Sequence, residues 1–169
     1  MPFDVLRWLV QYLHVLSGVL WFGAGFYVTL VQLPALVTLP PAQRVPAIAA
    51  LGPRQVRYIV RLAEITIGFG IFNAILTGRL ARLGETLGSL WGWAILIGTI
   101  LAIGLYVLLQ TGVKPAVFRI VAVARATQHG DVAGLAELPA LAQRIRTLGF
   151  VQMGVGAIIV LLMVTARFS

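Results

Sequence analysis

Residues 86–113 read TLGSLWGWAILIGTILAIGLYVLLQTGV and contain no charged side chain. An α-helix needs roughly 20 apolar residues to cross the hydrocarbon core of a bilayer, and this run is longer. The composition of the whole chain also favours insertion into a membrane, because 60% of its 169 residues are hydrophobic and only 11% are charged. A typical soluble domain has about 25% charged residues. The composition therefore indicates an integral membrane protein and excludes a large enzyme with separate catalytic domains.

Charges and prolines on both sides of this run divide the chain into four segments long enough to span a membrane. We expect transmembrane helices at residues 8–36, 60–79, 87–113 and 147–166, and helical cytoplasmic connections at residues 40–60 and 114–146. In the second connection, Gly130 is expected to end one helix and Asp131 to cap the next. The predicted fold is an all-α, four-transmembrane-helix bundle that forms one membrane domain over residues 1–169.

A weak internal repeat relates the two halves of the chain. The first predicted span ends in QLPA (residues 32–35) and the third ends in VKPA (residues 113–116). These segments favour two tandem helical hairpins of the same orientation, related by an axis along the membrane normal. The alternative is coincidence, because prolines often end membrane spans.

The 13 Lys and Arg residues are distributed unevenly between the predicted connections. Nine lie in the connections after the first and third spans, and four lie in the termini and the connection after the second span. The positive-inside rule then places both termini outside the cytoplasm. Cytoplasmic connections beside the lipid bilayer account for the net charge of +8, so nucleic acid is not an expected partner. The chain length and the lack of a transit peptide favour a prokaryotic inner (plasma) membrane.

His14 is the outstanding candidate for function, because an ionisable side chain within a membrane span is costly. Helical spacing places His14, Gly18, Trp21 and Gly25 on one face of the first span. A neutral imidazole can ligate haem iron or copper. The glycines would leave a groove beside the ring, for a flat cofactor or for the backbone of a neighbouring helix. The alternative role for His14 is a hydrogen bond between helices that stabilises their packing.

A second axial ligand for a haem has few candidates. The other histidine, His129, is expected in the cytoplasmic connection, so a haem with two histidines from one chain is not expected. The second position would be empty, come from another protomer, or be supplied by Met153 or Met163 of the fourth span, where methionine usually packs in the core. The chain has no cysteine, which excludes thiolate metal sites, iron–sulfur clusters held by its own thiolates and disulfides.

The second span carries a stripe of small and polar residues, namely Thr66, Gly70, Asn73 and Thr77. Unpaired amides are costly in hydrocarbon, so this stripe is expected to face the bundle. One possibility is that it lines a cavity, with Asn73 nearest a ligand. The other is that its small residues bring two helices into close contact.

Arg57, Arg61 and Glu64 share one helical face at the cytoplasmic mouth of the second span. Glu64 follows Arg61 by three residues, close enough for an ion pair. Arg57 and Arg61 would form a docking site for an anionic group, either a haem propionate or a lipid head group. The alternative is an interfacial ion pair with arginines that extend toward water.

The first span resembles that of a known group of membrane proteins. The residues that carry the resemblance are Leu13, His14, Gly18, Trp21, Phe22, Gly23 and the span-ending Pro34. They are similar to the pattern in the proteins grouped with copper-resistance protein D and in the related four-helix protoporphyrinogen oxidases, in which a first-span histidine is associated with haem. The resemblance covers the first two spans best and implies a b-type haem at His14.

Two departures limit what this resemblance implies. The protoporphyrinogen oxidase pattern has an arginine shortly after the tryptophan segment, whereas residues 27–34 carry no charge here. This difference argues against porphyrinogen oxidation. The chain has only three methionines and two histidines, so the number of ligands does not support copper transport.

We therefore expect a four-helix membrane protein that binds a planar hydrophobic cofactor. The favoured cofactor is b-type haem at His14, with an electron-transfer or haem-associated role, and the sequence leaves open whether the protein is an enzyme. One alternative is a non-enzymatic structural or accessory subunit that packs in a homo-oligomer or a larger membrane complex. A small transporter or channel is the third functional class.

Overall fold

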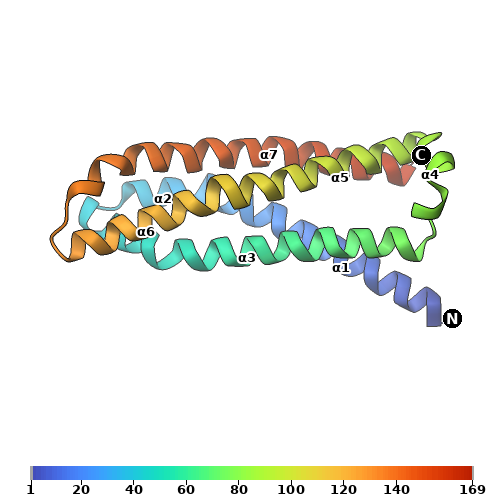
Figure 1. Cartoon of the computed structure of the whole chain (residues 1–169), viewed down its shortest axis with the longest axis horizontal. Coiled ribbons are helices and arrows are strands. Elements are labelled where there is room, and N and C mark those ends of the chain that lie inside the picture. Colours follow the sequence, from blue (N-terminus) through green and yellow to red (C-terminus); the bar gives the residue numbers. More distant parts are fainter. Residues whose placement is uncertain (1, 169) are drawn as a thin grey trace.

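The computed structural model describes residues 2–168 of the chain. Within these residues the regular secondary structure is entirely helical and contains no strand. Four long rods lie side by side, each antiparallel to the rod before it (Figure 1). This arrangement confirms the predicted all-α four-helix bundle.

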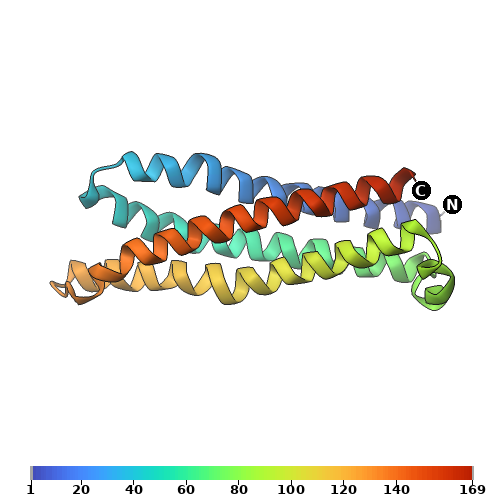
Figure 2. The same ribbon diagram turned by 90° about the horizontal axis from the view of Figure 1, so that it is seen from above.

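Two of the rods are composite and two are single helices. The first rod consists of α1 (Pro2–Tyr27), η1 (Val28–Gln32) and α2 (Leu33–Thr38), and the second is α3 (Pro41–Leu76). The third consists of α5 (Leu90–Leu108), η3 (Leu109–Val113) and α6 (Lys114–Gln128), and the fourth is α7 (Leu138–Phe168). The short elements are η2 (Leu80–Arg82), α4 (Leu83–Leu87) and η4 (Ala133–Glu137). Both chain ends lie at the same end of the bundle as α4, and the other two connections lie at the opposite end (Figures 1 and 2).

All four rods are long and apolar enough to cross a membrane, which indicates an integral membrane protein. The four apolar helical stretches, the last of which includes η4 as well as α7, are 35 to 38 residues long, or about 52 to 57 Å at 1.5 Å per residue. The hydrocarbon core of a bilayer is only about 30 Å thick, so part of the bundle extends beyond it. The sidedness of the bundle and the exact limits of the membrane spans rest on the charge distribution and stay predictions.

Each composite rod contains one π-helical turn just before a proline. Pro34 comes two residues after η1, and Pro115 comes two residues after η3. A proline has no N–H to donate, and its ring clashes with the carbonyl oxygen four residues earlier, so a wider turn accommodates it. The π turn and the proline both recur after 81 residues. The repeat predicted from the QLPA and VKPA segments is therefore present in the backbone.

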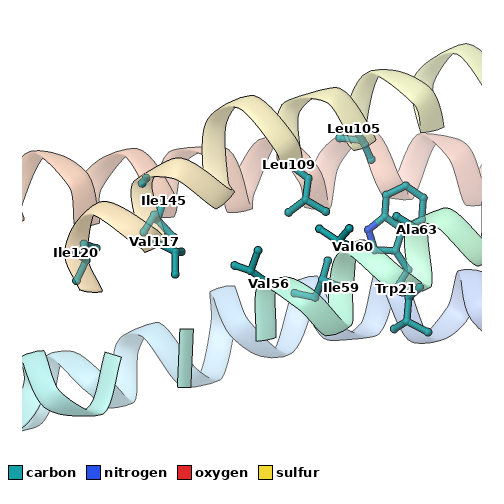
Figure 3. Packing of buried hydrophobic residues seen from close by; sticks show 12 residues of the cluster. Trp21, Val56, Ile59, Val60, Ala63, Leu105, Leu109, Val117, Ile120 and Ile145 are labelled. Carbon is teal, nitrogen blue, oxygen red and sulfur yellow. The ribbon is translucent and has the colours of Figure 1, made fainter. Parts of the chain in front are cut away.

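The hydrophobic core lies mainly in the half of the bundle away from the chain ends. Its buried residues come from α3, from the rod of α5 and α6 and from α7, with Trp21 of α1 beside Ala63 (Figure 3). Side chains of the other half are largely exposed, and only 6% of the most apolar window of α7 is buried inside the protein. An apolar surface of this extent needs lipid to cover it.

The connection between α6 and α7 follows the local sequence as expected. The helix α6 ends at Gln128, and Gly130 has a φ of +88°, a left-handed conformation that glycine adopts readily. Oδ1 of Asp131 then accepts a hydrogen bond from the backbone N–H of Ala133 at 3.0 Å. The predicted helix end at Gly130 is confirmed, whereas the N-cap position of η4 is Val132 and Asp131 makes its hydrogen bond from the residue before it.

A cation–π contact fixes the connection between the two hairpins. The guanidinium carbon of Arg79 lies 3.7 Å from the centroid of the Trp91 ring. Burial, and to a smaller extent repulsion by Arg7, lower the pKa of Arg79. The contact joins the end of α3 to the start of α5.

Candidate functional site

His14 lies on the face of α1 that packs against α3. Its Nδ1 atom is 2.8 Å from the backbone carbonyl oxygen of Thr66. A carbonyl oxygen only accepts hydrogen bonds, so Nδ1 donates and the neutral ring keeps its lone pair on Nε2. In histidine ligands of metals, one ring nitrogen likewise donates to a carbonyl or carboxylate oxygen while the other binds the metal. The contact therefore leaves Nε2 of His14 able to act as a ligand.

Gly70 allows the imidazole to approach α3 closely. A Cβ atom at this position would lie 2.9 Å from Cε1 and 3.1 Å from Nδ1 of His14, but 3.8 Å from Nε2. The first two distances are shorter than optimal van der Waals separations, so glycine is the residue that fits beside the ring. The ring meets α3 through its Cε1–Nδ1 edge, and Nε2 lies farther from Gly70.

Further polar contacts join α1 to α3 on both sides of His14. The hydroxyl oxygen of Thr66 lies 3.0 Å from Oγ of Ser17. Toward the chain ends, Nδ2 of Asn73 donates to Oε1 of Gln11 at 2.6 Å. Asn73 is therefore on the same seam as His14, with its amide bound to α1. Gln11 and Ser17 were not among the predicted site residues, although a spacing of three residues on either side of His14 places them on its face.

Neighbouring helices occupy the predicted glycine face of the first span. At Gly18 a Cβ atom would lie 3.4 Å from Cγ2 of Thr66 on α3. At Gly25 it would overlap the amide of Gln152 on α7. Trp21, between these two glycines, is 7% exposed and belongs to the hydrophobic core. Of the two occupants predicted for this groove, the structure shows a neighbouring helix on this face.

The other predicted ligand candidates lie apart from this seam. Met153 is half-buried on α7, and the methyl group of Met163 packs close to Gly98 of α5. His129 is exposed and follows α6, whose C-terminal end lies away from the chain ends (Figure 1). Within residues 2–168 as described, no three His, Asp or Glu side chains come together as a metal site. A metal at His14 would therefore need its other ligands from a cofactor or from another molecule.

A chain of hydrogen bonds links α3 to α6. The predicted ion pair is confirmed, with Nη1 of Arg61 2.8 Å from Oε2 of Glu64. Oε1 of the same carboxylate accepts a hydrogen bond from the Tyr106 hydroxyl at 3.2 Å. Gln110 donates to the Tyr106 hydroxyl at 2.8 Å, and Lys114 donates to Gln110 at 3.0 Å. Tyr106 and Gln110 were not predicted, although their spacing of four residues places them on one helix face with Lys114.

The predicted anionic docking residues lie at the surface of α3. Arg57 is exposed, and the side chain of Arg61 is 78% exposed. Both guanidinium groups are thus accessible to an anionic group outside the bundle. The nature of that group stays a prediction.

A small cavity of about 70 Å³ lies between the two hairpins, where η1 and η3 both line it. Four uncharged polar side chains share the lining with apolar residues: Thr29, Gln32, Gln55 and Gln152. The amide of Gln55 donates to Oε1 of Gln32, which joins α3 to η1. These residues were not among the predicted site residues. The sequence feature that could have indicated this site is the position of Gln32, two residues before the proline that recurs in both halves.

An apolar groove of about 360 Å³ runs along the exposed side of α1. It is lined by Gly18, Val19, Phe22, Gly23 and Phe26 of α1 and by Val160 of α7. A Cβ atom at Gly23 would meet nothing within 4 Å, so no neighbouring helix of this chain contacts this glycine. The missing side chain widens the groove. Binding sites for cofactors and drug-sized ligands commonly measure about 300 to 1,000 Å³. The groove reaches that size, and the cavity between the hairpins does not.

No protein-family model, curated protein or solved structure matches the chain. The resemblance of the first span to the copper-resistance protein D group therefore rests on the residues quoted for it. The structure shows four apolar helices that are long enough to cross a membrane, which indicates an integral membrane protein. Its function has to be argued from the geometry around His14.

Proposed function

We propose that the protein binds b-type haem through Nε2 of His14 and acts in electron transfer or in another haem-associated role. The observation that carries this proposal is the hydrogen bond from Nδ1 of His14 to the carbonyl oxygen of Thr66. It gives the imidazole the tautomer and the fixed orientation that an axial ligand needs. When bound, the haem iron would supply one-electron redox chemistry.

The apolar groove on the exposed side of α1 would hold the flat group, although His14 itself does not line it. The apolar groove of about 360 Å³ includes Gly18, one helical turn from His14. Its apolar lining suits a flat hydrophobic molecule. The cavity of about 70 Å³ between the hairpins is too small for a porphyrin. His14 would hold the iron, and any further ligand would come from Met153, Met163 or another molecule, because His129 belongs to a different part of the bundle.

Residues of α3 would hold the ligand in place. The Thr66 carbonyl accepts a hydrogen bond from Nδ1 and so fixes the orientation of the ring, and Gly70 leaves the space that the ring occupies. Apolar side chains of the groove would exclude water from the bound face. Arg57 and Arg61, exposed on α3, would attract a haem propionate or a lipid head group.

The proposal is tested by absorption spectroscopy on protein purified from haem-replete cells and on the same protein after addition of hemin. We expect a Soret band in the wild type, its loss in His14→Ala and its retention in His129→Ala, the matched control. Gly70→Ala keeps the histidine but displaces the ring, so its band should weaken or shift. A wild type without any Soret band, or an unchanged band in His14→Ala, would refute haem ligation by His14.

A second candidate function is that of an accessory subunit in a homo-oligomer or a larger membrane complex. It is favoured by four exposed glycines within the long rods where a Cβ atom would meet nothing within 4 Å, namely Gly23, Gly68, Gly104 and Gly154. Small residues on a lipid-facing surface let a further helix approach. If this alternative holds, His14→Ala changes the assembly or the stability of the protein, measured by size-exclusion chromatography with light scattering. The absorption spectrum then stays unchanged.

For the cellular location we propose a prokaryotic inner membrane with both termini outside the cytoplasm. Support comes from the arrangement of the rods, which brings both termini and the α4 connection to one end (Figure 2). The four basic residues of the N-terminus, the connection after the second span and the C-terminus thus gather at that end, and the other nine lie in α3, in α6 and near the start of α7. The positive-inside rule assigns the richer end to the cytoplasm.

A further inference from the structure

The cavity between the hairpins is built from corresponding parts of the two repeats. Thr29 and Gln32 come from η1, and Leu109 and Val113 come from η3. π turns inside helices are frequent at functional sites, because they leave backbone and side chains in positions that a regular helix does not allow. In membrane proteins built from repeats, binding sites lie where the repeats meet.

Two glycines allow polar side chains to reach this cavity on the seam between α1 and α7. Gln152 of α7 occupies the space that a Cβ atom of Gly25 would take. Thr29 inserts in the opposite direction, with its hydroxyl oxygen 2.5 Å from the position of a Cβ atom at Gly149. Each polar side chain thus lies opposite a glycine of the other helix. The arrangement directs an amide and a hydroxyl into the interior, where each needs a hydrogen-bond partner.

The structure gives the Thr29 hydroxyl no protein partner among the described residues, although Thr29 is only 5% exposed. Other helical threonines donate to the carbonyl oxygen four residues earlier, as Thr66 does at 2.7 Å and Thr99 at 2.8 Å. Thr111 lies within the other π turn, η3, and makes this bond at 2.8 Å, so the π turn alone does not account for the free hydroxyl of Thr29. The amide of Gln152 also has no hydrogen bond to the described part of the chain, and it lines the same cavity.

The size and the charge of the cavity define what it can bind. Its volume of about 70 Å³ corresponds to about two water molecules at roughly 30 Å³ each. The lining contains no charged side chain among the described residues, so a bound ion would lose its hydration without a counter-charge. A buried water molecule makes about three hydrogen bonds to otherwise unsatisfied polar groups, and the cavity presents such groups.

We propose that this cavity is a binding site for water. A pair of water molecules bridges Thr29 to Gln152 across the seam of α1 and α7 and reaches the amide pair of Gln32 and Gln55. The water supplies the missing hydrogen bonds and joins three of the four rods at the level of both π turns. Neither His14 nor haem takes part, so this proposal and the proposed function can fail independently.

The first experiment uses the wild-type protein in nanodiscs under xenon pressure, observed by xenon NMR. Dry cavities bind xenon, whereas a polar hydrated cavity excludes it. We expect no xenon site at the hairpin junction, and magnetic relaxation dispersion should detect long-lived water that Thr29→Val and Gln152→Leu lose. Xenon binding at the junction, or identical long-lived water in all three proteins, would overturn the proposal.

The second experiment uses the sign of a stability change. Thr29→Val keeps the shape of the side chain and removes its hydroxyl. If water bridges the hydroxyl, the midpoint of thermal unfolding should fall by about 2 to 4 °C. If the cavity is dry, the midpoint should rise, because the variant removes a buried hydroxyl without a partner. Thr99→Val, at an exposed position of α5, is the matched control, and a raised or unchanged midpoint in Thr29→Val contradicts hydration.

Discussion

Replacing Gly70 by alanine tests the packing of α1 on α3 directly. The new methyl group would lie 2.9 Å from Cε1 and 3.1 Å from Nδ1 of His14, so the ring or the helix has to move. Movement of the ring breaks its hydrogen bond to the Thr66 carbonyl, now 2.8 Å long. Overpacking costs about 1–3 kcal/mol, and the lost hydrogen bond about 0.5–1.5 kcal/mol. Alanine offsets about 1 kcal/mol through its helix propensity, which leaves a net destabilisation of about 0.5–3.5 kcal/mol.

Gly68→Ala is the matched control, two residues earlier on the same helix. A Cβ atom at Gly68 would meet nothing within 4 Å. We therefore expect this variant to be neutral or more stable by up to about 1 kcal/mol. The assay is reversible unfolding of the purified protein in mixed detergent micelles, followed by circular dichroism. The difference between the two alanine variants isolates the clash with the imidazole.

A double-mutant cycle then identifies the group that causes the clash. In the His14→Ala background the imidazole is gone, so Gly70→Ala should lose most of its cost and show a coupling of about 1–3 kcal/mol. The described packing of His14 would be wrong if Gly70→Ala were as harmless as Gly68→Ala. It would also be wrong if the cost of Gly70→Ala persisted without the imidazole.

Three further predictions concern other parts of the bundle. Gly156→Ala should destabilise the protein by about 1–3 kcal/mol in the same unfolding assay, because its Cβ atom would overlap an aromatic ring of α1. Gly154→Ala should not destabilise the protein, because a Cβ atom there meets nothing within 4 Å. Equal destabilisation by the two alanine variants would contradict the described packing of α7 on α1. Tyr106→Phe removes the hydroxyl that donates to the carboxylate on α3 and should cost about 0.5–1.5 kcal/mol, whereas no change would show that this contact does not stabilise the fold. Because the chain has no cysteine, Ser89→Cys and Ala133→Cys introduce single thiols at opposite ends of the bundle. In intact cells a membrane-impermeant maleimide should label the first and not the second, and the reverse pattern would invert the proposed topology.

The sequence predicted the residue at the centre of the candidate site but not its surroundings. His14 is identifiable because an imidazole is rare within an apolar span. Its partner is a backbone carbonyl oxygen, that of Thr66, and the residue at its edge is Gly70. Every residue has a carbonyl oxygen, so no side-chain pattern can indicate which one accepts this hydrogen bond.

The polar cavity between the hairpins was missed for a related reason. Thr29 and Gln55 are common residues at ordinary helical positions, and nothing in their local sequence distinguishes them. They line one cavity with Gln152 only because the rods pack together, since Thr29 comes from the π turn η1, Gln55 from α3 and Gln152 from α7. The proline that accompanies this turn was visible in the sequence, but the number of residues in the turn depends on the packing around it.

The sequence by itself determined that four apolar rods cross a membrane, that a proline-containing segment recurs in both halves and that a glycine ends α6. Each of these depends on the hydropathy or the backbone of one short stretch. Only the tertiary structure decided that Gly18 and Gly25 receive neighbouring helices while Gly23 stays open, and that His14 meets a residue 52 positions away. The physical reason is that lipid is as apolar as the interior of the bundle. Hydrophobicity therefore does not fix the rotation of a membrane helix, and close packing at small residues sets it instead.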